Sequence, residues 1–72
     1  MTTFKEALFL NDLIQFLLPS GQVLTRRTCL IDRPPSQAKG WRVDDDGEWI
    51  TDMGGQWLET GEGKMIWRER AS

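Results

Sequence analysis

The first third of the chain carries the longest apolar stretch, and its spacing predicts a helix from about Phe4 to Leu18. Thr3 and Glu6 have the spacing of a capping box, and Pro19-Ser20-Gly21 ends the segment. At about 100° per residue the helix has one broad apolar face, made of Ala7, Leu10, Ile14, Leu17 and Leu18, with Phe4 and Leu13 on its flanks. We expect this face to pack against the rest of the protein.

Two large rings fall on the other side of this predicted helix. Phe9 and Phe16 lie two turns apart, beside the polar residues Lys5 and Asp12. The solvent side of such a helix is normally polar. We therefore expect both rings to be exposed and to contact a partner, because exposed aromatic side chains mark binding surfaces.

The middle of the chain predicts one strand followed by a loop. Residues 22–31 have strand character through their β-branched and small apolar members, namely Val23, Thr25, Thr28, Cys29 and Ile31. Residues 33–40 contain the pair Pro34-Pro35 and a polar tail, which cannot continue a central strand. We expect an exposed loop there.

A short theme recurs from Gly40 onward. Trp41, Trp49 and Trp57 follow one another at intervals of eight residues, a period that suits one strand plus one tight turn. Asp46-Gly47 and Gly54-Gly55 are favoured two-residue hairpin turns. The pattern predicts an antiparallel meander over about 41–68. One N-terminal helix packed on a small antiparallel sheet of three to four strands is an α+β fold, in a single domain spanning 1–72.

The composition argues against common chemical sites. A chain of 72 residues is long enough for one domain, and it has one cysteine and no histidine. These counts exclude an internal disulfide and any common zinc site, so we expect no metal and no cofactor. Asp44-Asp45-Asp46-Gly47 lacks the ligand spacing of a calcium loop and reads as a hairpin turn.

Catalysis and membrane insertion are not expected either. Asp52 and Glu59 are candidate carboxylates for acid-base chemistry, but so thin a domain seldom offers the cleft that such chemistry needs. We expect a non-enzymatic protein. The apolar run from Ala7 to Leu18 is interrupted by polar residues and is too short to span a membrane. Together with the single cysteine, this favours a cytoplasmic setting.

Charge is unevenly distributed along the chain. The net charge is −2, which argues against a general nucleic-acid binder. Basic residues gather in the middle, at Arg26, Arg27, Arg33, Lys39 and Arg42, and acidic ones dominate after Asp44. One interpretation is a solvated strand and loop. The other is a docking patch for an acidic protein or a nucleic-acid backbone.

The whole-chain arrangement resembles the small transcription regulators of lytic Xanthomonas phages, which bind the host RNA polymerase. The shared features are size, the apolar helix Phe4-Lys5-Glu6-Ala7-Leu8-Phe9-Leu10, a basic middle and a tryptophan-rich end punctuated by glycines. The resemblance implies a cytoplasmic protein of the host cell that engages the N-terminal segment of the polymerase β′ subunit and the β flap. It further implies inhibition of sigma-dependent initiation and promotion of antitermination.

Three hypotheses for the partner follow from these observations. The leading one is host RNA polymerase, with nucleic acid met only through the polymerase and the protein acting as a monomer. The second is another host complex, such as a defence complex blocked by an anti-CRISPR protein. The third is direct nucleic-acid binding through arginines and stacked tryptophans. The candidate contact residues come from the surplus of exposed rings and from the basic segment: Phe9, Phe16, Arg26, Arg27, Arg33 and Arg42.

Overall fold

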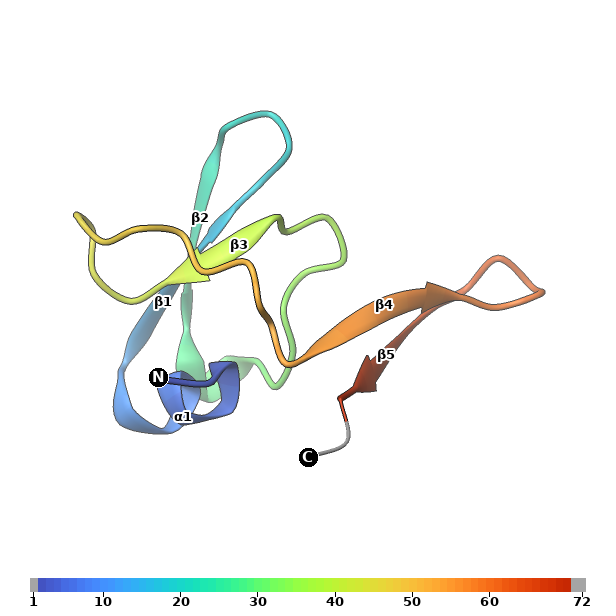
Figure 1. The fold of residues 1–72 in the computed structure, drawn as a ribbon, viewed down its shortest axis with the longest axis horizontal. Helices are drawn as coiled ribbons and strands as arrows, with labels where there is room; N and C mark the ends of the chain where they lie inside the picture. The colour runs from blue at the N-terminus through green and yellow to red at the C-terminus, as the bar shows by residue number, and fades with distance from the viewer. Residues whose placement is uncertain (1, 71–72) are drawn as a thin grey trace.

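A computed structural model describes residues 2–70 and contains one short helix and two separate antiparallel sheets (Figure 1). The elements are α1 (Phe4–Leu10), β1 (Leu13–Leu17), β2 (Val23–Arg27), the 3-10 turn η1 (Thr28–Leu30), β3 (Gly40–Arg42), β4 (Gly55–Glu59) and β5 (Met65–Glu69). The first sheet has the order β2-β1-β3, and β4 pairs with β5 alone. The predicted α+β class, with one helix on a small antiparallel sheet, is confirmed.

The predicted helix is correct at its start and wrong at its end. Thr3 caps α1 as expected, because its hydroxyl accepts a hydrogen bond from the Glu6 N–H at 3.2 Å. The helix then ends at Leu10 rather than at Leu18. Asn11 stops it by adopting an extended backbone, and its side-chain Nδ2 donates to the Ala7 carbonyl at 3.0 Å. Such local side-chain bonds offer the backbone an alternative to further helix.

Residues 13–17, which the prediction placed in the helix, form the central strand β1. Ile14 and Phe16 are buried and their neighbours are not, so burial follows the two-residue period of a strand. The Pro19-Ser20-Gly21 segment does not merely stop an element but joins β1 to β2. Leu18 donates to the Gln22 carbonyl at 2.9 Å, which closes the hairpin.

Both β-hairpins use the same type of turn. Gly21 and Gly63 have φ values of 89° and 78°, a left-handed conformation that glycine adopts without steric cost. Each donates its N–H to the carbonyl three residues earlier, at 2.9 Å to Leu18 and at 3.0 Å to Thr60. A three-residue loop of this kind is common in hairpins. The β4–β5 hairpin projects away from the remainder of the molecule (Figure 1).

The predicted continuous meander over 41–68 is wrong. β3 pairs with β1, and on its other side Trp41 forms an isolated bridge with Ile50, whose N–H and carbonyl bond to Trp41 at 2.8 and 2.9 Å. Asp46-Gly47 is not a two-residue hairpin turn, because Gly47 closes a turn that begins at Asp44. Gly54-Gly55 likewise leads into β4 instead of joining two paired strands.

The predicted strand and loop in the middle are partly correct. β2 covers Val23–Arg27, and η1 then occupies Thr28–Leu30, which the prediction had assigned to the strand. Residues 33–39 form a loop, as expected. Pro34 within this loop is buried, however, and its carbonyl accepts a hydrogen bond from Trp57 Nε1 at 3.1 Å. The loop therefore anchors the β4–β5 hairpin.

The core lies between α1 and one face of the three-stranded sheet. It comprises Phe4, Ala7, Ile14, Phe16 and Trp41. The Phe4 ring centroid lies 6.0 Å from Phe16 and 5.7 Å from Trp41, in tilted and edge-on arrangements that aromatic pairs favour. Leu10, predicted on the packed helix face, is exposed because α1 ends there.

Candidate docking surface

The strand register divides the three-stranded sheet into a covered face and an open face. Phe16 faces the core, as does Trp41, its partner in β3. Alternate residues point the other way. The open face of β1 therefore carries Leu13, Gln15 and Leu17, which lie opposite Arg27, Thr25 and Val23 of β2.

A corner of the molecule forms where α1 ends, β1 begins and η1 follows β2. Thr28 holds these segments together: its hydroxyl donates to the Asn11 carbonyl at 2.5 Å, and its N–H donates to the Asp12 carbonyl at 3.0 Å. α1 also contacts η1 directly. Thr28 is itself buried, so this polar bond fixes the corner from inside.

Large apolar side chains stand exposed on all three segments of this corner. We define the corner patch as Phe9, Leu10, Leu13 and Leu30, which are 87, 67, 53 and 76% exposed. Single exposed apolar residues are ordinary on protein surfaces. Four of them lie on neighbouring segments of a domain whose described core has five residues, so exposed apolar side chains are concentrated at this corner.

Phe9 and Phe16, predicted to share an exposed side of one helix, have opposite environments. Phe9 is exposed, as expected. Phe16 is 0% exposed and belongs to the core, so its assignment to a contact surface is wrong. The physical reason is the end of the helix at Leu10: in β1 the strand period turns Phe16 inward with Ile14.

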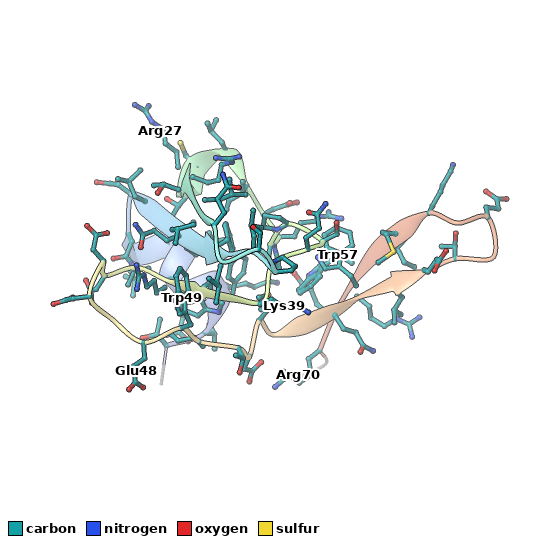
Figure 2. The ribbon with its side chains drawn as sticks, turned by 90° about the horizontal axis from the view of Figure 1, so that it is seen from above. Arg27, Lys39, Glu48, Trp49, Trp57 and Arg70 are labelled. Carbon is teal, nitrogen blue, oxygen red and sulfur yellow. The ribbon has the colours of Figure 1, made fainter. Side chains whose placement is uncertain are left out.

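Arg26 and Arg27 lie next to the corner patch on the edge strand β2. Both are exposed, and Arg27 stands directly opposite Leu13 in the sheet. Figure 2 shows Arg27 at the periphery, pointing away from the body of the molecule. The Arg26 guanidinium donates only to the carbonyl of its neighbour Thr25, at 2.9 Å, and no ion pair involving either arginine occurs within residues 2–70.

Arg42, another of the predicted basic contacts, is engaged inside the molecule. Its guanidinium donates to Gln15 Oε1 at 2.8 Å and to the Gly47 carbonyl at 3.1 Å. It also lies 4.2 Å from the centre of the Trp49 ring, a favourable cation-π distance. Arg42 thus ties the loop after β3 to β1, and its three internal contacts leave it little capacity to bind a partner.

Arg33 is also paired within the chain. Its Nε and Nη2 donate to the two carboxylate oxygens of Asp32, at 3.1 and 3.3 Å. This hydrogen bonding and the positive charge lower the pKa of Asp32. The structure therefore separates the predicted basic residues: Arg26 and Arg27 stay together at the β2 edge, while Arg33 and Arg42 are occupied elsewhere.

The tryptophans are mainly structural. Trp41 lies in the core and donates from Nε1 to the Asp52 carbonyl at 3.1 Å. Trp57 and Trp67 pack on each other across β4 and β5, with ring centroids 5.5 Å apart. Trp49 is half-buried under Arg42. The tryptophan rings, which were candidates for stacking on a ligand, therefore mainly make contacts within the protein.

A groove of about 450 Å³ lies between the start of α1 and the base of the β4–β5 hairpin. Three of its charged lining residues, Lys5, Glu69 and Arg70, form ion pairs. Lys5 Nζ lies 2.7 Å from Glu69 Oε2, and Arg70 binds Asp52 through both of its terminal nitrogens. Hydrogen bonds from Arg70 and from the Gly54 N–H lower the pKa of Asp52. The exposed Lys5–Glu69 pair links α1 to β5, and the exposed Arg70–Asp52 pair links the two ends of the hairpin.

Within residues 2–70, no group of three or more His, Cys, Asp or Glu side chains is placed to hold a metal ion. No helix in the same range is long and apolar enough to cross a membrane.

Sequence reasoning missed three members of the corner patch. Leu10 was assigned to the packed helix face and Leu13 to its flank, and Leu30 had no assigned role. The signal for Leu10 and Leu13 was Asn11-Asp12, a polar pair that favours helix ends over helix interiors. No comparable signal existed for Leu30, because its exposure depends on η1 turning away from the sheet after Thr28.

Comparison with known proteins adds no relative: no family model, curated protein or solved structure matches the chain.

Proposed function

We propose that this protein acts by docking on another protein through the corner patch, without catalysing a reaction. The observation that carries the proposal is the exposure of Phe9, Leu10, Leu13 and Leu30 on three segments fixed together by Thr28. Burying such side chains against a partner would remove apolar surface from water, the main source of association free energy. A rigid support limits the entropy lost on binding.

The neighbouring charges give the proposed surface a preferred partner. Arg27 borders the patch through Leu13, and Arg26 follows on the same strand. Charges at the rim of an apolar contact guide association and set orientation more than they raise affinity. An apolar site on the partner with acidic residues beside it fits this arrangement.

Bacterial RNA polymerase is the partner we propose to test first. This choice rests on the resemblance in chain arrangement to phage regulators that inhibit sigma-dependent initiation and promote antitermination. The surface described above suits such a role, since a small rigid body with an apolar patch can occupy a site that another factor needs. Binding alone would then be sufficient for regulation.

Purified polymerase and a promoter-driven transcription assay test the proposal. The double variant Leu13→Ser/Leu30→Ser removes the middle of the patch, and Ile66→Ser is the matched control, because Ile66 is also half-exposed but lies on the β4–β5 hairpin. We expect the double variant to bind at least about tenfold more weakly, because it lacks two leucines that the partner would bury in the complex. The control should bind and inhibit as the unmodified protein does.

Two outcomes would redirect the proposal. Equal binding by the double variant and the control would exclude the corner patch as the docking site. Absence of polymerase binding by the unmodified protein would reject this partner, and affinity capture followed by mass spectrometry would then show whether a defence complex takes its place. A gel shift with single-stranded DNA that weakens steeply with salt would favour nucleic acid instead.

A further inference from the structure

Within residues 2–70, no other strand pairs with the outer edge of β2. β2 pairs with β1 on one side only, and four of its five residues are exposed. At the other end of the sheet, Ile50 bonds to the outer side of β3. β2 is therefore the free edge of the three-stranded sheet, and a free edge is a template for pairing with another strand.

The hydrogen bonds at the two ends of the β1–β2 pair show which groups face outward. Leu18 bonds to Gln22 at one end, and Thr28 bonds to Asp12 at the other. In an antiparallel pair, bonded positions alternate with non-bonded ones. Counting inward from both ends, Leu24 and Arg26 bond to β1. The N–H and C=O groups of Val23, Thr25 and Arg27 consequently point to the free edge.

Two positive side chains stand on opposite faces of this edge. Arg27 lies on the open face opposite Leu13, and Arg26 lies on the other face opposite Ile14. The Arg26 guanidinium covers the outward Thr25 carbonyl at 2.9 Å in the free protein. A carboxylate would bind this guanidinium more strongly than a neutral carbonyl does. An acidic strand can therefore draw it away and expose the edge.

We propose that the β2 edge binds an extended acidic segment of the partner protein by adding it to the sheet as a fourth strand. The inference rests on the proposed function, because it supplies the part of the interface beside the corner patch. Backbone bonds to Val23, Thr25 and Arg27 provide the attachment, and the two arginines select the charge. Strand addition is an established mode of peptide recognition.

The register converts this proposal into a sequence pattern. An antiparallel segment, read from its N-terminus, passes Arg27, Arg26, Thr25, Leu24 and Val23 in turn. Its first two residues are acidic, to face the two arginines. The third is a β-branched polar residue opposite Thr25, and the last two are apolar. The pattern is thus Glu-Glu-Thr-Val-Val or a close variant.

A second copy of this chain fits the edge less well. In an antiparallel pairing of two β2 strands about Thr25, Arg27 would face Val23 and Arg26 would face Leu24. All four arginines would then lack an acidic partner. In a parallel in-register pairing, arginine would face arginine, which is destabilising. The same charges that repel a second copy select an acidic strand.

A labelled peptide tests the proposal on the full-length protein. The probe is a glycine-flanked Glu-Glu-Thr-Val-Val peptide, and binding is followed by fluorescence anisotropy at low salt up to about 1 mM protein. N-methylation of the third residue removes an N–H that faces Thr25, whereas N-methylation of the fourth blocks an N–H that faces solvent. We expect the first change to weaken binding at least about tenfold and the second to have little effect.

Several results would overturn the inference. Equal effects of the two methyl groups would mean that the peptide adds no strand. Equal binding of a Lys-Lys-Thr-Val-Val peptide would mean that the arginines select nothing. An unmodified protein that dimerises through β2 in light scattering, or that binds single-stranded DNA more tightly than the peptide, would assign the edge to a different occupant.

Variants of β2 separate this inference from the proposed function. Thr25→Pro removes only an outward N–H, so the hydrogen bonds between β1 and β2 remain. Proline is tolerated on edge strands for the same reason. We expect it to lose peptide binding while its circular dichroism is unchanged. If Thr25→Pro misfolds, the double variant Arg26→Glu/Arg27→Glu replaces it. This variant should bind the Lys-Lys-Thr-Val-Val peptide more tightly than the Glu-Glu-Thr-Val-Val peptide. If the β2 variants still bind the partner protein while the corner-patch variant does not, the edge inference fails and the proposed function stands.

Discussion

Leu13 and Arg27 face each other across the β1–β2 pair, and both side chains are exposed on the open face of the sheet. This pair joins an apolar surface to a charged one: Leu13 belongs to the corner patch, and Arg27 belongs to the free edge of β2. The corner patch and the free edge therefore meet at this pair. A partner that covers Leu13 would also lie beside Arg27.

Two phenylalanines should respond oppositely to substitution. Phe16→Ala removes a ring from the centre of the core and should lower the free energy of unfolding by about 3–5 kcal/mol. Phe9→Ser changes an exposed ring and should alter it by about 0.5 kcal/mol or less. Urea denaturation followed by circular dichroism measures both. A large loss for Phe9→Ser would show that this ring is packed and unavailable for docking.

The buried hydroxyl of Thr28 should stabilise the corner. Thr28→Val keeps the size of the side chain but leaves the carbonyl of Asn11 without its donor, which should cost about 1–3 kcal/mol of unfolding free energy. Thr28→Ser is the matched control, because it retains the hydroxyl. Thermal unfolding should place the serine variant between the valine variant and the unmodified protein. Equal stability of the valine and serine variants would exclude a role for the hydrogen bond.

The bond from Trp57 to Pro34 should hold the projecting hairpin. Trp57→Phe keeps an aromatic ring beside Trp67 but removes the Nε1 donor, at an expected cost of about 1 kcal/mol. Isolated two-stranded hairpins are marginally stable. Amide hydrogen exchange in β4 and β5 should therefore accelerate, while exchange in β1 stays unchanged. Uniform acceleration throughout the protein would show that the bond supports the whole fold.

Acid should loosen the hairpin base through Asp52. The folded pKa of Asp52 lies below its ordinary value of 3.8, because Arg70 and the Gly54 N–H hydrogen-bond to the carboxylate. A lowered pKa contributes stability above about pH 4 that is lost as the pH falls through the folded value. The Asp52→Asn variant should lack this part of the acid sensitivity. Melting temperatures between pH 2 and 7 measure the difference, which salt should reduce because both groups are exposed.

The parts of the fold that were predicted correctly depend on interactions between near neighbours in the chain. The part that was missed depends on whether residues 13–17 form a helix or a strand. The Thr3 cap and the loop at residues 33–39 follow from short-range chemistry and were found. Residues 13–17 fit a helical apolar stripe, and as a strand they place Ile14 and Phe16 together on one face. Asn11 decides between them by bonding to Ala7. The prediction of a helix up to Leu18 gave too little weight to the polar pair Asn11-Asp12.

The candidate site was harder to predict for a physical reason. Exposure of Leu30 and engagement of Arg42 are set by contacts with residues distant in the chain, since η1 packs near Asn11 and Arg42 reaches Gln15. Sequence patterns indicate which residues two, three or four positions apart share a face of a helix or strand. They do not indicate contacts between residues far apart in the chain. The expectation that apolar side chains exceed what the fold can bury holds for Phe9. It was wrong for Phe16, whose environment changed with its secondary structure.

The most direct test of docking through the corner patch uses Cys29, the sole cysteine of the chain, which is exposed in η1 next to Leu30. A photoreactive maleimide attached there on the purified protein should cross-link to the partner protein in a cell lysate, and mass spectrometry should identify it. The same label at Glu62→Cys in a Cys29→Ser background, at the far turn of the β4–β5 hairpin, should give no adduct. Equal adducts from both positions, or none from Cys29, would contradict the account.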